Sequence, residues 1–233
     1  MKSLLAALGL CLALRATAGE IIVQNIKGDV SVRHGVTETW TRVAAGDVLR
    51  PDDTMKTGKK GGALLVTDAA GRAGGKKTLA LPGEVIVDLS DIRELSQEEL
   101  MLKLTMEKVR ASSYEWKNEE LHIPNAAAVH GADRSPATLK EGDTLTGVLQ
   151  LNGARVLFDN GYFATCALKG MEVFRRYPSL GTDFRNRLLI AEALEKASLH
   201  GEAISEYGIL ARMEGLTGDQ QNLVKGRIQS LRK

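Results

Sequence analysis

The hydrophobic and polar positions of this chain follow two different periodicities, one in each half. In the first, short aliphatic runs alternate with polar residues and are separated by Gly, Asp and Pro. Val30 and Val32 face the same way, with polar residues between and after them, which is the period-2 pattern of a half-buried strand. The strands are expected within 20–26, 28–35, 39–43, 47–53, 62–72 and 78–89. Many short strands at close spacing predict a small all-β domain, a sandwich or a barrel-like fold.

The spacing of apolar residues changes near residue 96 from a strand-like to a helical pattern. Ser96 and Glu99 have the spacing of a capping box, which satisfies backbone donors at the start of a helix. Apolar residues then share one helical face, and they are Leu95, Leu102, Met106 and Val109. We expect a helix from 96 to 112 that uses this face to pack against the β-domain or to bridge to the next part.

From residue 149 the helical rhythm holds to the end of the chain. The candidate helices lie within 149–160, 162–178, 182–200, 201–215 and 217–233. Short helices joined by tight turns predict antiparallel helical hairpins. The expected fold is therefore α+β in two parts. Its divisions are a β-domain over 19–92, a bridging helix over 93–113, a linker or extended arm over 114–147 and a helical domain over 148–233.

The first 18 residues are typical of a secretory signal peptide. Lys2 gives a positive start, 4–14 is apolar, and 16–18 reads Ala-Thr-Ala, a small-residue cleavage signal. The apolar run has 11 residues, and a membrane-spanning helix needs roughly 17 to 25. No later stretch is apolar enough to span a bilayer. We expect an exported protein, periplasmic or secreted, with no integral membrane span in the mature chain.

Charge and cysteine content narrow the possible partners. The sequence has 31 Lys and Arg against 29 Asp and Glu, and cleavage after Ala18 would remove Lys2 and Arg15, leaving an even balance. A nucleic-acid or anionic-membrane partner would demand a basic excess, so neither is expected. Only Cys166 would survive cleavage, which excludes an intrachain disulfide. We expect Cys166 to be a buried packing residue rather than a reactive thiol.

The acidic stretch GDVLRPDDTMKTG, residues 46–58, raises the question of a metal site. Asp47, Asp52 and Asp53 fall at expected strand ends and turns, where short polar side chains bond to the backbone. The stretch lacks the Asp-x-Asp-x-Asp-Gly run of a calcium loop. We therefore interpret these aspartates as turn residues.

Other candidate motifs for catalysis or cofactor binding do not have the residue spacing that such sites require. GRAGGKKT, residues 71–78, resembles a phosphate-binding loop, but its spacing is wrong and a strand is expected to follow it. The histidines are scattered without metal-ligand spacing, and they are His34, His122, His130 and His200. No nucleophile motif or carboxylate pair stands out. We expect no catalytic, metal or cofactor-binding residues, no bound cofactor and no enzymatic activity.

Aromatic residues gather in the helical half. Trp40 is the only one between residues 19 and 113, which disfavours sugar stacking on the β-domain. Aromatic side chains that remain on a concave helical face would be anchors for a protein partner. The candidate partner-binding residues are Tyr162, Phe163, Tyr177, Phe184 and Tyr207.

Residues 20–90 resemble the FecR domain family. That family has a Gly-x-Val-x-Val start, an aromatic residue, Gly-Asp-x-Leu, a polar turn with Thr-Gly and an aliphatic strand. The matching residues are Gly28, Val30, Val32, Trp40, Val43, Gly46, Asp47, Leu49, Thr57, Gly58, Ala63 and Leu65. The segment TLALPGEVIVDL fits the apolar strand with which the family ends.

Residues 149–233 resemble tetratricopeptide repeats. Gly161 and Pro178 have the glycine-to-proline spacing of one repeat, and Gly170 stands where an aromatic residue is usual. The repeat's packing positions are filled by Ala154, Leu157, Cys166 and Val173, and then by Ala191, Leu194, Ala203, Tyr207 and Leu210. The last segment would be a capping helix, which helical arrays need to shield their open end.

The two resemblances imply a binding role. We expect a non-enzymatic, exported cell-envelope protein that acts as a scaffold, with an envelope protein or peptide bound by the helical part. One alternative is a module that binds peptidoglycan or another glycan, with cell-wall polymer as its partner. A second alternative is an envelope signalling component.

Overall fold

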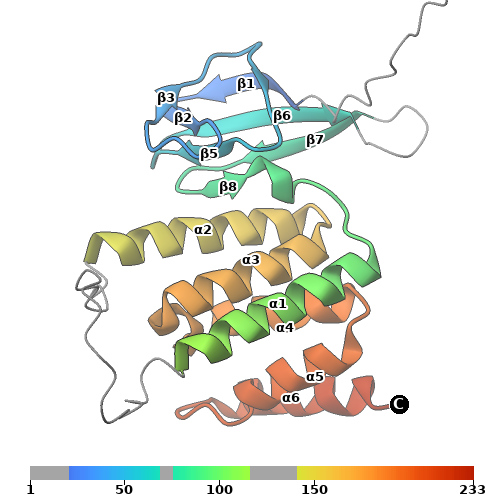
Figure 1. The fold of residues 1–233 in the computed structure, drawn as a ribbon. Helices are drawn as coiled ribbons and strands as arrows, with labels where there is room; N and C mark the ends of the chain where they lie inside the picture. Colours follow the sequence, from blue (N-terminus) through green and yellow to red (C-terminus); the bar gives the residue numbers. More distant parts are fainter. Residues whose placement is uncertain (1–20, 69–75, 116–140) are drawn as a thin grey trace, which may run out of the picture.

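The computed structural model describes residues 21–68, 76–115 and 141–233 (Figure 1). The predicted signal peptide over 1–18, His122 and His130 lie outside these residues, as does most of the predicted linker. The described chain forms two parts, an N-terminal β-domain and a group of C-terminal helices that lies beneath it in Figure 1. This confirms the predicted two-part α+β organisation.

The β-domain contains two antiparallel sheets of four strands each. The strands are β1 (Ile21–Lys27), β2 (Val30–Arg33), β3 (Thr41–Arg42), β4 (Val48–Leu49), β5 (Thr54–Thr57), β6 (Gly62–Asp68), β7 (Lys76–Leu81) and β8 (Ile86–Asp88). Their order is β4-β1-β6-β7 in one sheet and β3-β2-β5-β8 in the other. The two sheets share one core, in which Val23, Met55 and Leu65 are fully buried.

One central strand, β5, was missed from the sequence. Residues 54–57 read Thr-Met-Lys-Thr and lie where the FecR family pattern has a polar turn, but they pair with both β2 and β8. The strand tolerates its polar composition because both threonine hydroxyls have partners. Thr54 donates to Asp88 at 2.6 Å, and Thr57 donates to the Pro82 carbonyl at 2.7 Å.

The helices are α1 (Gln97–Glu115), α2 (Glu141–Asp159), α3 (Phe163–Arg176), α4 (Phe184–Lys196), α5 (His200–Leu210) and α6 (Gly218–Leu231), with short 3-10 turns η1 (Leu89–Asp91) and η2 (Pro178–Thr182). Two of them start at side-chain caps. Asp183 accepts a hydrogen bond from the Asn186 amide at 2.9 Å, and Thr217 forms a capping box with Gln220. The five helices predicted between 149 and 233 are confirmed. No helix in the described part of the chain has the length and apolar character to cross a membrane.

The predicted linker is wrong at its C-terminal end, because residues 141–147 belong to α2. The first turns of α2 contain Thr144, Thr146 and Gly147, which have low helix propensity and hide the helix from pattern reading. Gly147 is placed by packing, since a Cβ atom there would lie 2.6 Å from the Tyr177 ring. Contact with Tyr177 after α3 therefore requires a residue without a side chain at this position of α2.

The helices approach one another closely, as small residues at the packing positions predict. The positions expected to be buried are so, and they are Ala154, Leu157, Cys166, Val173, Ala191, Leu194, Ala203, Tyr207 and Leu210. Gly170 on α3 faces Ile190 on α4, and a Cβ atom at Gly170 would lie 1.9 Å from the Ile190 Cδ1 atom. The isoleucine fills the space above the glycine, so no aromatic residue is needed there.

Helix α1 forms where expected, but it packs with a different face. Glu99 donates its amide to Ser96 Oγ at 3.2 Å, which is one of the two hydrogen bonds of the predicted capping box. The Glu99 carboxylate pairs with Arg93 and Lys103 instead. The predicted apolar face points outward instead, with Leu102 63%, Met106 46% and Val109 61% exposed. The buried face contains Leu100 and Leu104. Apolar residues lie on both sides of this helix, so periodicity alone could not choose the face.

Candidate functional site

The β-domain meets the helices through β8 and η1 on one side and α2 and α3 on the other. We call this contact the junction. Its α2 side depends on shape: a Cβ atom at Gly153 would lie 2.0 Å from the Ile86 carbonyl oxygen. Only glycine lets α2 lie this close to the β8 backbone. Beside it, the Asn152 amide donates to the Glu84 carbonyl at 2.9 Å.

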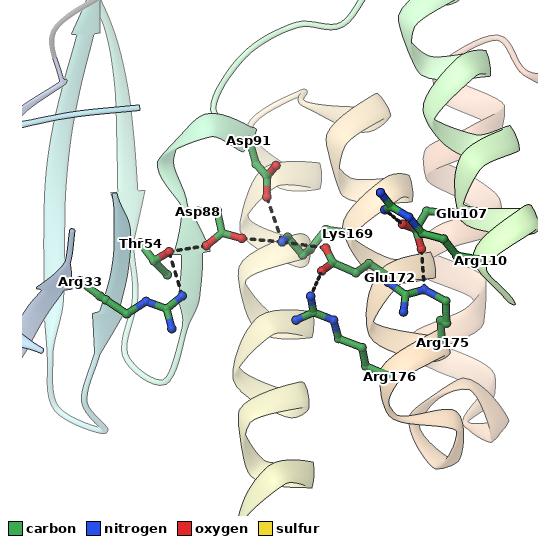
Figure 2. A network of polar contacts seen from close by, with 10 residues as sticks. All are labelled: Arg33, Thr54, Asp88, Asp91, Glu107, Arg110, Lys169, Glu172, Arg175 and Arg176. Carbon is green, nitrogen blue, oxygen red and sulfur yellow. Dashed lines mark hydrogen bonds and ion pairs between the residues drawn. The ribbon is translucent and has the colours of Figure 1, made fainter. Parts of the chain in front are cut away.

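The α3 side of the junction is ionic. Lys169 projects from α3, and its side chain is only 10% exposed. Figure 2 shows three carboxylates around its ammonium group. Lys169 Nζ lies 2.6 Å from Asp88 Oδ2, 3.1 Å from Glu172 Oε2 and 3.4 Å from Asp91 Oδ2. We call these four residues the Lys169 cluster.

The cluster is anchored in both parts of the chain (Figure 2). On the β side, Asp88 accepts a hydrogen bond from Thr54, whose hydroxyl oxygen lies 3.4 Å from a donating Arg33 nitrogen. On the helical side, Glu172 pairs with Arg176 at 2.8 Å. The polar contacts therefore run from strand β2 through β5 and β8 to helix α3. They hold the two parts in one fixed relation.

The carboxylates of the cluster have opposite electrostatic behaviour. Burial favours the neutral form of Asp88, but the Lys169 ammonium outweighs it and lowers the pKa of Asp88. Burial raises the pKa of Asp91 to about 6, because Lys169 only partly offsets it and Asp88 and Glu172 add repulsion. Burial alone would lower the pKa of Lys169, but attraction to the surrounding carboxylates is the larger effect and raises it. Of Asp88 and Asp91, Asp91 is thus the carboxyl group that takes up a proton more easily.

The chemistry of the cluster is that of a structural ion network. Its ammonium group occupies the position between the carboxylates where a cation would bind. In the described part of the chain, no group of three or more His, Cys, Asp or Glu residues is arranged to hold a metal ion. The arrangement can hold two parts together, and it can gain or lose a proton.

Helix α1 is fixed to α3 by a second ionic contact. Glu107 is buried on α1 and accepts hydrogen bonds from Arg175 Nε at 2.8 Å and from Arg110 Nη1 at 2.5 Å. The opposite side of α1 exposes large apolar side chains. We call this surface the α1 face, and it consists of Met101, Leu102, Met106 and Val109. A row of exposed apolar residues on a rigidly held helix is typical of a binding surface.

An open cleft continues the α1 face at the N-terminal end of the helix. Its volume is about 480 Å³. Met101 belongs to both surfaces, and Gln97 and Glu98 complete the α1 side of the cleft. The other wall is 198–202, the turn into α5. The cleft is shallow and wide, which suits a side chain of a partner protein better than an enclosed small molecule.

Three of the five aromatic residues predicted to bind a partner are core residues instead. Tyr207 is fully buried, and its hydroxyl donates to Glu195 Oε2 at 2.8 Å. Tyr162 and Tyr177 are buried as well, and the Lys77 ammonium lies 3.8 Å from the Tyr162 ring centre. The Tyr207 hydroxyl has an internal partner, so the polar end of this buried ring is satisfied without exposure to water.

The other two predicted aromatics, Phe163 and Phe184, are partly buried. Phe163 packs edge-to-face on Phe158 with a centroid distance of 5.2 Å, and the Lys196 ammonium lies above its ring. Phe184 packs against the main core at the start of α4. Neither belongs to the exposed large apolar residues of the described chain.

The aspartates of the acidic stretch are turn residues, as predicted. Asp47 accepts a hydrogen bond from the Ala44 amide at 2.8 Å, and Asp53 accepts one from the Arg50 amide at 2.9 Å. Asp53 is buried and also pairs with His34 Nδ1 at 2.9 Å. Asp52 is exposed. The stretch shapes the loops around β4 and β5.

Two further sequence predictions concern Cys166 and the residues near the phosphate-loop-like motif. Cys166 is fully buried, and burial raises the pKa of its thiol to about 12, which keeps it protonated and unreactive. Residues 76–81 form strand β7 where a phosphate-binding loop would need a helix. Both predictions are confirmed.

Sequence reasoning missed the Lys169 cluster. Asp88 and Lys169 are 81 residues apart, and no local pattern pairs residues at that distance. One signal was present: Lys169 is the single charged residue in the mostly apolar segment ATCALKGM of α3. A lysine flanked by apolar residues on a packed helix needs an acidic partner, because an unpaired buried charge is costly.

Comparisons of this chain with protein-family models, with curated proteins and with solved structures find no match.

Proposed function

We propose that this chain is a non-enzymatic, exported cell-envelope protein that binds another protein through its helical half. In this proposal the β-domain is FecR-like and the helices are tetratricopeptide-like. Two observations support these resemblances. The β-domain has the many short antiparallel strands that the first predicts, and the small residues of the second are buried between close helices.

The observation that carries the proposal is the α1 face. Leu102, Met106 and Val109 have the i, i+4, i+7 spacing with which helices contact other helices, and they are more exposed than their type normally is. Leu100 and Leu104 already hold the helix on its buried side. The outward row therefore adds nothing to the core, while it offers a partner a preformed apolar ridge.

Charge suggests the chemistry of the partner. Acidic side chains lie at the N-terminal end of α1, where Glu98 is fully exposed and also lines the cleft. Basic side chains lie towards the other end, where Lys108 is exposed. The matching partner is an amphipathic helix with an apolar face, a basic end over Glu98 and an acidic end over Lys108.

The test is an affinity capture from a detergent-solubilised envelope extract with the mature chain, from Gly19, as bait. The test variant carries Leu102→Glu and Met106→Glu. Its matched control is Val36→Glu, because Val36 is a fully exposed apolar residue on the β-domain. Melting temperatures of all baits establish that each is folded.

We expect a protein that the wild type and Val36→Glu retain and that the double variant loses by at least tenfold. Retention of the same protein by the double variant would refute the α1 face as the site. Capture of wall polymer alone by every bait would favour the glycan-binding alternative, and sedimentation with purified wall would then measure it.

A further inference from the structure

We propose that the junction is a pH-responsive latch, which tightens when Asp91 takes up a proton and loosens when Asp91 is charged. The inference concerns the contact between the two parts and does not depend on the proposed binding function. It rests on the arrangement of three carboxylates around a single buried ammonium group (Figure 2).

The three carboxylates are not held equally. Asp88 receives hydrogen bonds from both Lys169 and Thr54, and Glu172 receives support from both Lys169 and Arg176. Asp91 has only the longest contact to Lys169, and its buried Oδ2 atom lacks a well-aligned hydrogen-bond donor. One ammonium group therefore serves three negative charges, and Asp91 is the weakest-held of them. A proton on Asp91 would remove the repulsion that Asp88 and Glu172 exert on it.

The charged groups around Asp91 come from both sides of the junction. Lys169 and Glu172 face it from α3, with Arg176 behind Glu172, and Asp88 faces it from the end of β8. Arg33 on β2 acts on Asp88 from the far side. Three carboxylates and three cations balance when Asp91 is charged. These groups are therefore neutral in total. Lys169 is shared among all three carboxylates, however, so the charge of Asp91 is only partly neutralised.

The sign of the effect follows from linkage. Asp91 has a pKa of about 6 in the folded chain, above its ordinary value of 3.8, so the folded state binds this proton more strongly than the unfolded state. Protonation of Asp91 therefore adds stability as the pH falls from about 7 towards 4. Asp88 acts in the opposite direction, because its lowered pKa costs stability only at more acidic pH.

The position of Asp91 extends the effect beyond the cluster. Asp91 ends η1, the short turn that joins β8 to the segment leading into α1. A loosened contact at Asp91 would free η1 from α3, while Glu107 and Arg175 still hold α1 at their own contact. The latch therefore controls how firmly the β-domain sits on the helices.

The experiment compares the melting temperatures of the mature wild type and Asp91→Asn between pH 5.0 and 8.0. Asparagine is the neutral shape-match of a protonated aspartate. At pH 7.5 we expect Asp91→Asn to melt about 5 °C above the wild type, since each kcal/mol is worth about 2–4 °C in a chain of this size. The gap should shrink to about half by pH 5, because the unfolded chain keeps Asp91 charged down to its ordinary pKa of 3.8. Other groups that titrate in this range are common to both proteins and cancel in the difference.

A second variant and a measurement on the unaltered protein complete the test. Asp88→Asn should melt below the wild type at pH 7.5, because it removes the carboxylate that Lys169 holds best. In the wild type, carbon NMR should show one aspartate carboxyl titrating near pH 6, assigned to Asp91 through the backbone resonances of that residue. This titration decides the question even if a variant does not fold.

Two outcomes would overturn the latch. One is an Asp91 carboxyl that titrates below about pH 4.5, close to the ordinary range of aspartate. The other is an Asp91→Asn chain that is no more stable than the wild type at pH 7.5.

Discussion

The two sides of the junction hold the same pair of domains by different means. On the α2 side, Gly153 allows the helix to touch the β8 backbone, and shape alone fixes the distance. On the α3 side, Lys169 joins Asp88 and Asp91 across the boundary through charge. A contact set by shape is the same at every pH, whereas a contact set by charge changes with protonation. The α2 side therefore sets where the domains meet, and the α3 side sets how firmly they are held there under given conditions.

The largest expected effect lies on the α2 side. Gly153→Ala places a Cβ atom 2.0 Å from the Ile86 carbonyl oxygen, which is backbone and cannot rotate away. We expect a loss of more than about 3 kcal/mol of unfolding free energy, equal at pH 5 and pH 8. Urea denaturation of the chain from Gly19 at both pH values would measure it.

Gly201→Ala is the matched control, because that helical glycine has open space around its Cβ position. It should gain up to about 1 kcal/mol from helix propensity. If Gly153→Ala were as well tolerated, shape would not be what positions α2 on β8.

The next largest effect is expected from Lys169→Met on the α3 side. The change keeps much of the apolar stem but leaves the carboxylates of Asp88, Asp91 and Glu172 without their shared ammonium. We expect the free energy of unfolding to fall by about 3 kcal/mol at pH 8, because removing one partner of a buried ion network leaves the other charges uncompensated. The loss should shrink towards pH 5, because protonation of Asp91 relieves the repulsion.

The control for this variant is Lys196→Met, an exposed lysine whose ammonium lies over the rings of Phe158 and Phe163. It should cost about 0.5–1 kcal/mol at either pH. A Lys169→Met loss that does not change with pH would mean that the cluster acts through packing rather than charge. Thermal melts across pH 5 to 8 provide the comparison.

A smaller effect is expected from Glu107→Gln, which weakens the ionic contact between α1 and α3. Burial opposes the charge of Glu107, but Arg175 and Arg110 outweigh it and lower its pKa. Its contribution is therefore present above the ordinary pKa of glutamate and is lost as the pH falls through the lower folded value. We expect a loss of about 1–2 kcal/mol at pH 7.

Urea denaturation at pH 7 and pH 3 would check this prediction, with Glu98→Gln as the control because Glu98 is fully exposed. The dependence on pH is opposite in sign to that expected for Asp91. Equal losses for Glu107→Gln at both pH values would contradict the assigned charge state.

The smallest effect is expected from Asn152→Ala, which removes the side-chain hydrogen bond to the Glu84 carbonyl. The bond lies at the exposed rim of the α2 contact, where water can replace it, so we expect a loss below about 1 kcal/mol. A loss above about 2 kcal/mol in the same urea assay would show that this bond, and not the close approach at Gly153, fixes α2.

Much of the fold was predictable because it depends on local patterns. Alternating residues such as Val30 and Val32 indicated the β-domain, and Ser96 marked the start of α1. The small residues at the helical packing positions indicated close helix contacts. Strand β5 could not be predicted from its polar sequence. Its threonine hydroxyls are satisfied by partners far along the chain, and a local pattern does not show such partners.

The junction and the α1 face could not be found in this way. Leu100 and Leu102 are equally apolar, and only the position of α3 decides which of them is buried. Tyr207 looks like a surface anchor until its hydroxyl is seen to bond to Glu195. The Lys169 cluster depends on contacts between distant parts of the chain, so it exists only once both parts are folded.

The separation of Asp88 from Lys169 also sets an order of events during synthesis. The strands of the β-domain pair among themselves within residues 21–88, so they can form before any of α2 or α3 exists. The 81 residues up to Lys169 take about 4–16 s to add at typical rates of 5–20 residues per second. For most of that time, until α2 is added, β8 is an edge strand of its sheet without α2 or α3 against it. An uncovered edge strand can pair with other chains, so each new copy passes through an aggregation-prone interval that ends only when α2 arrives.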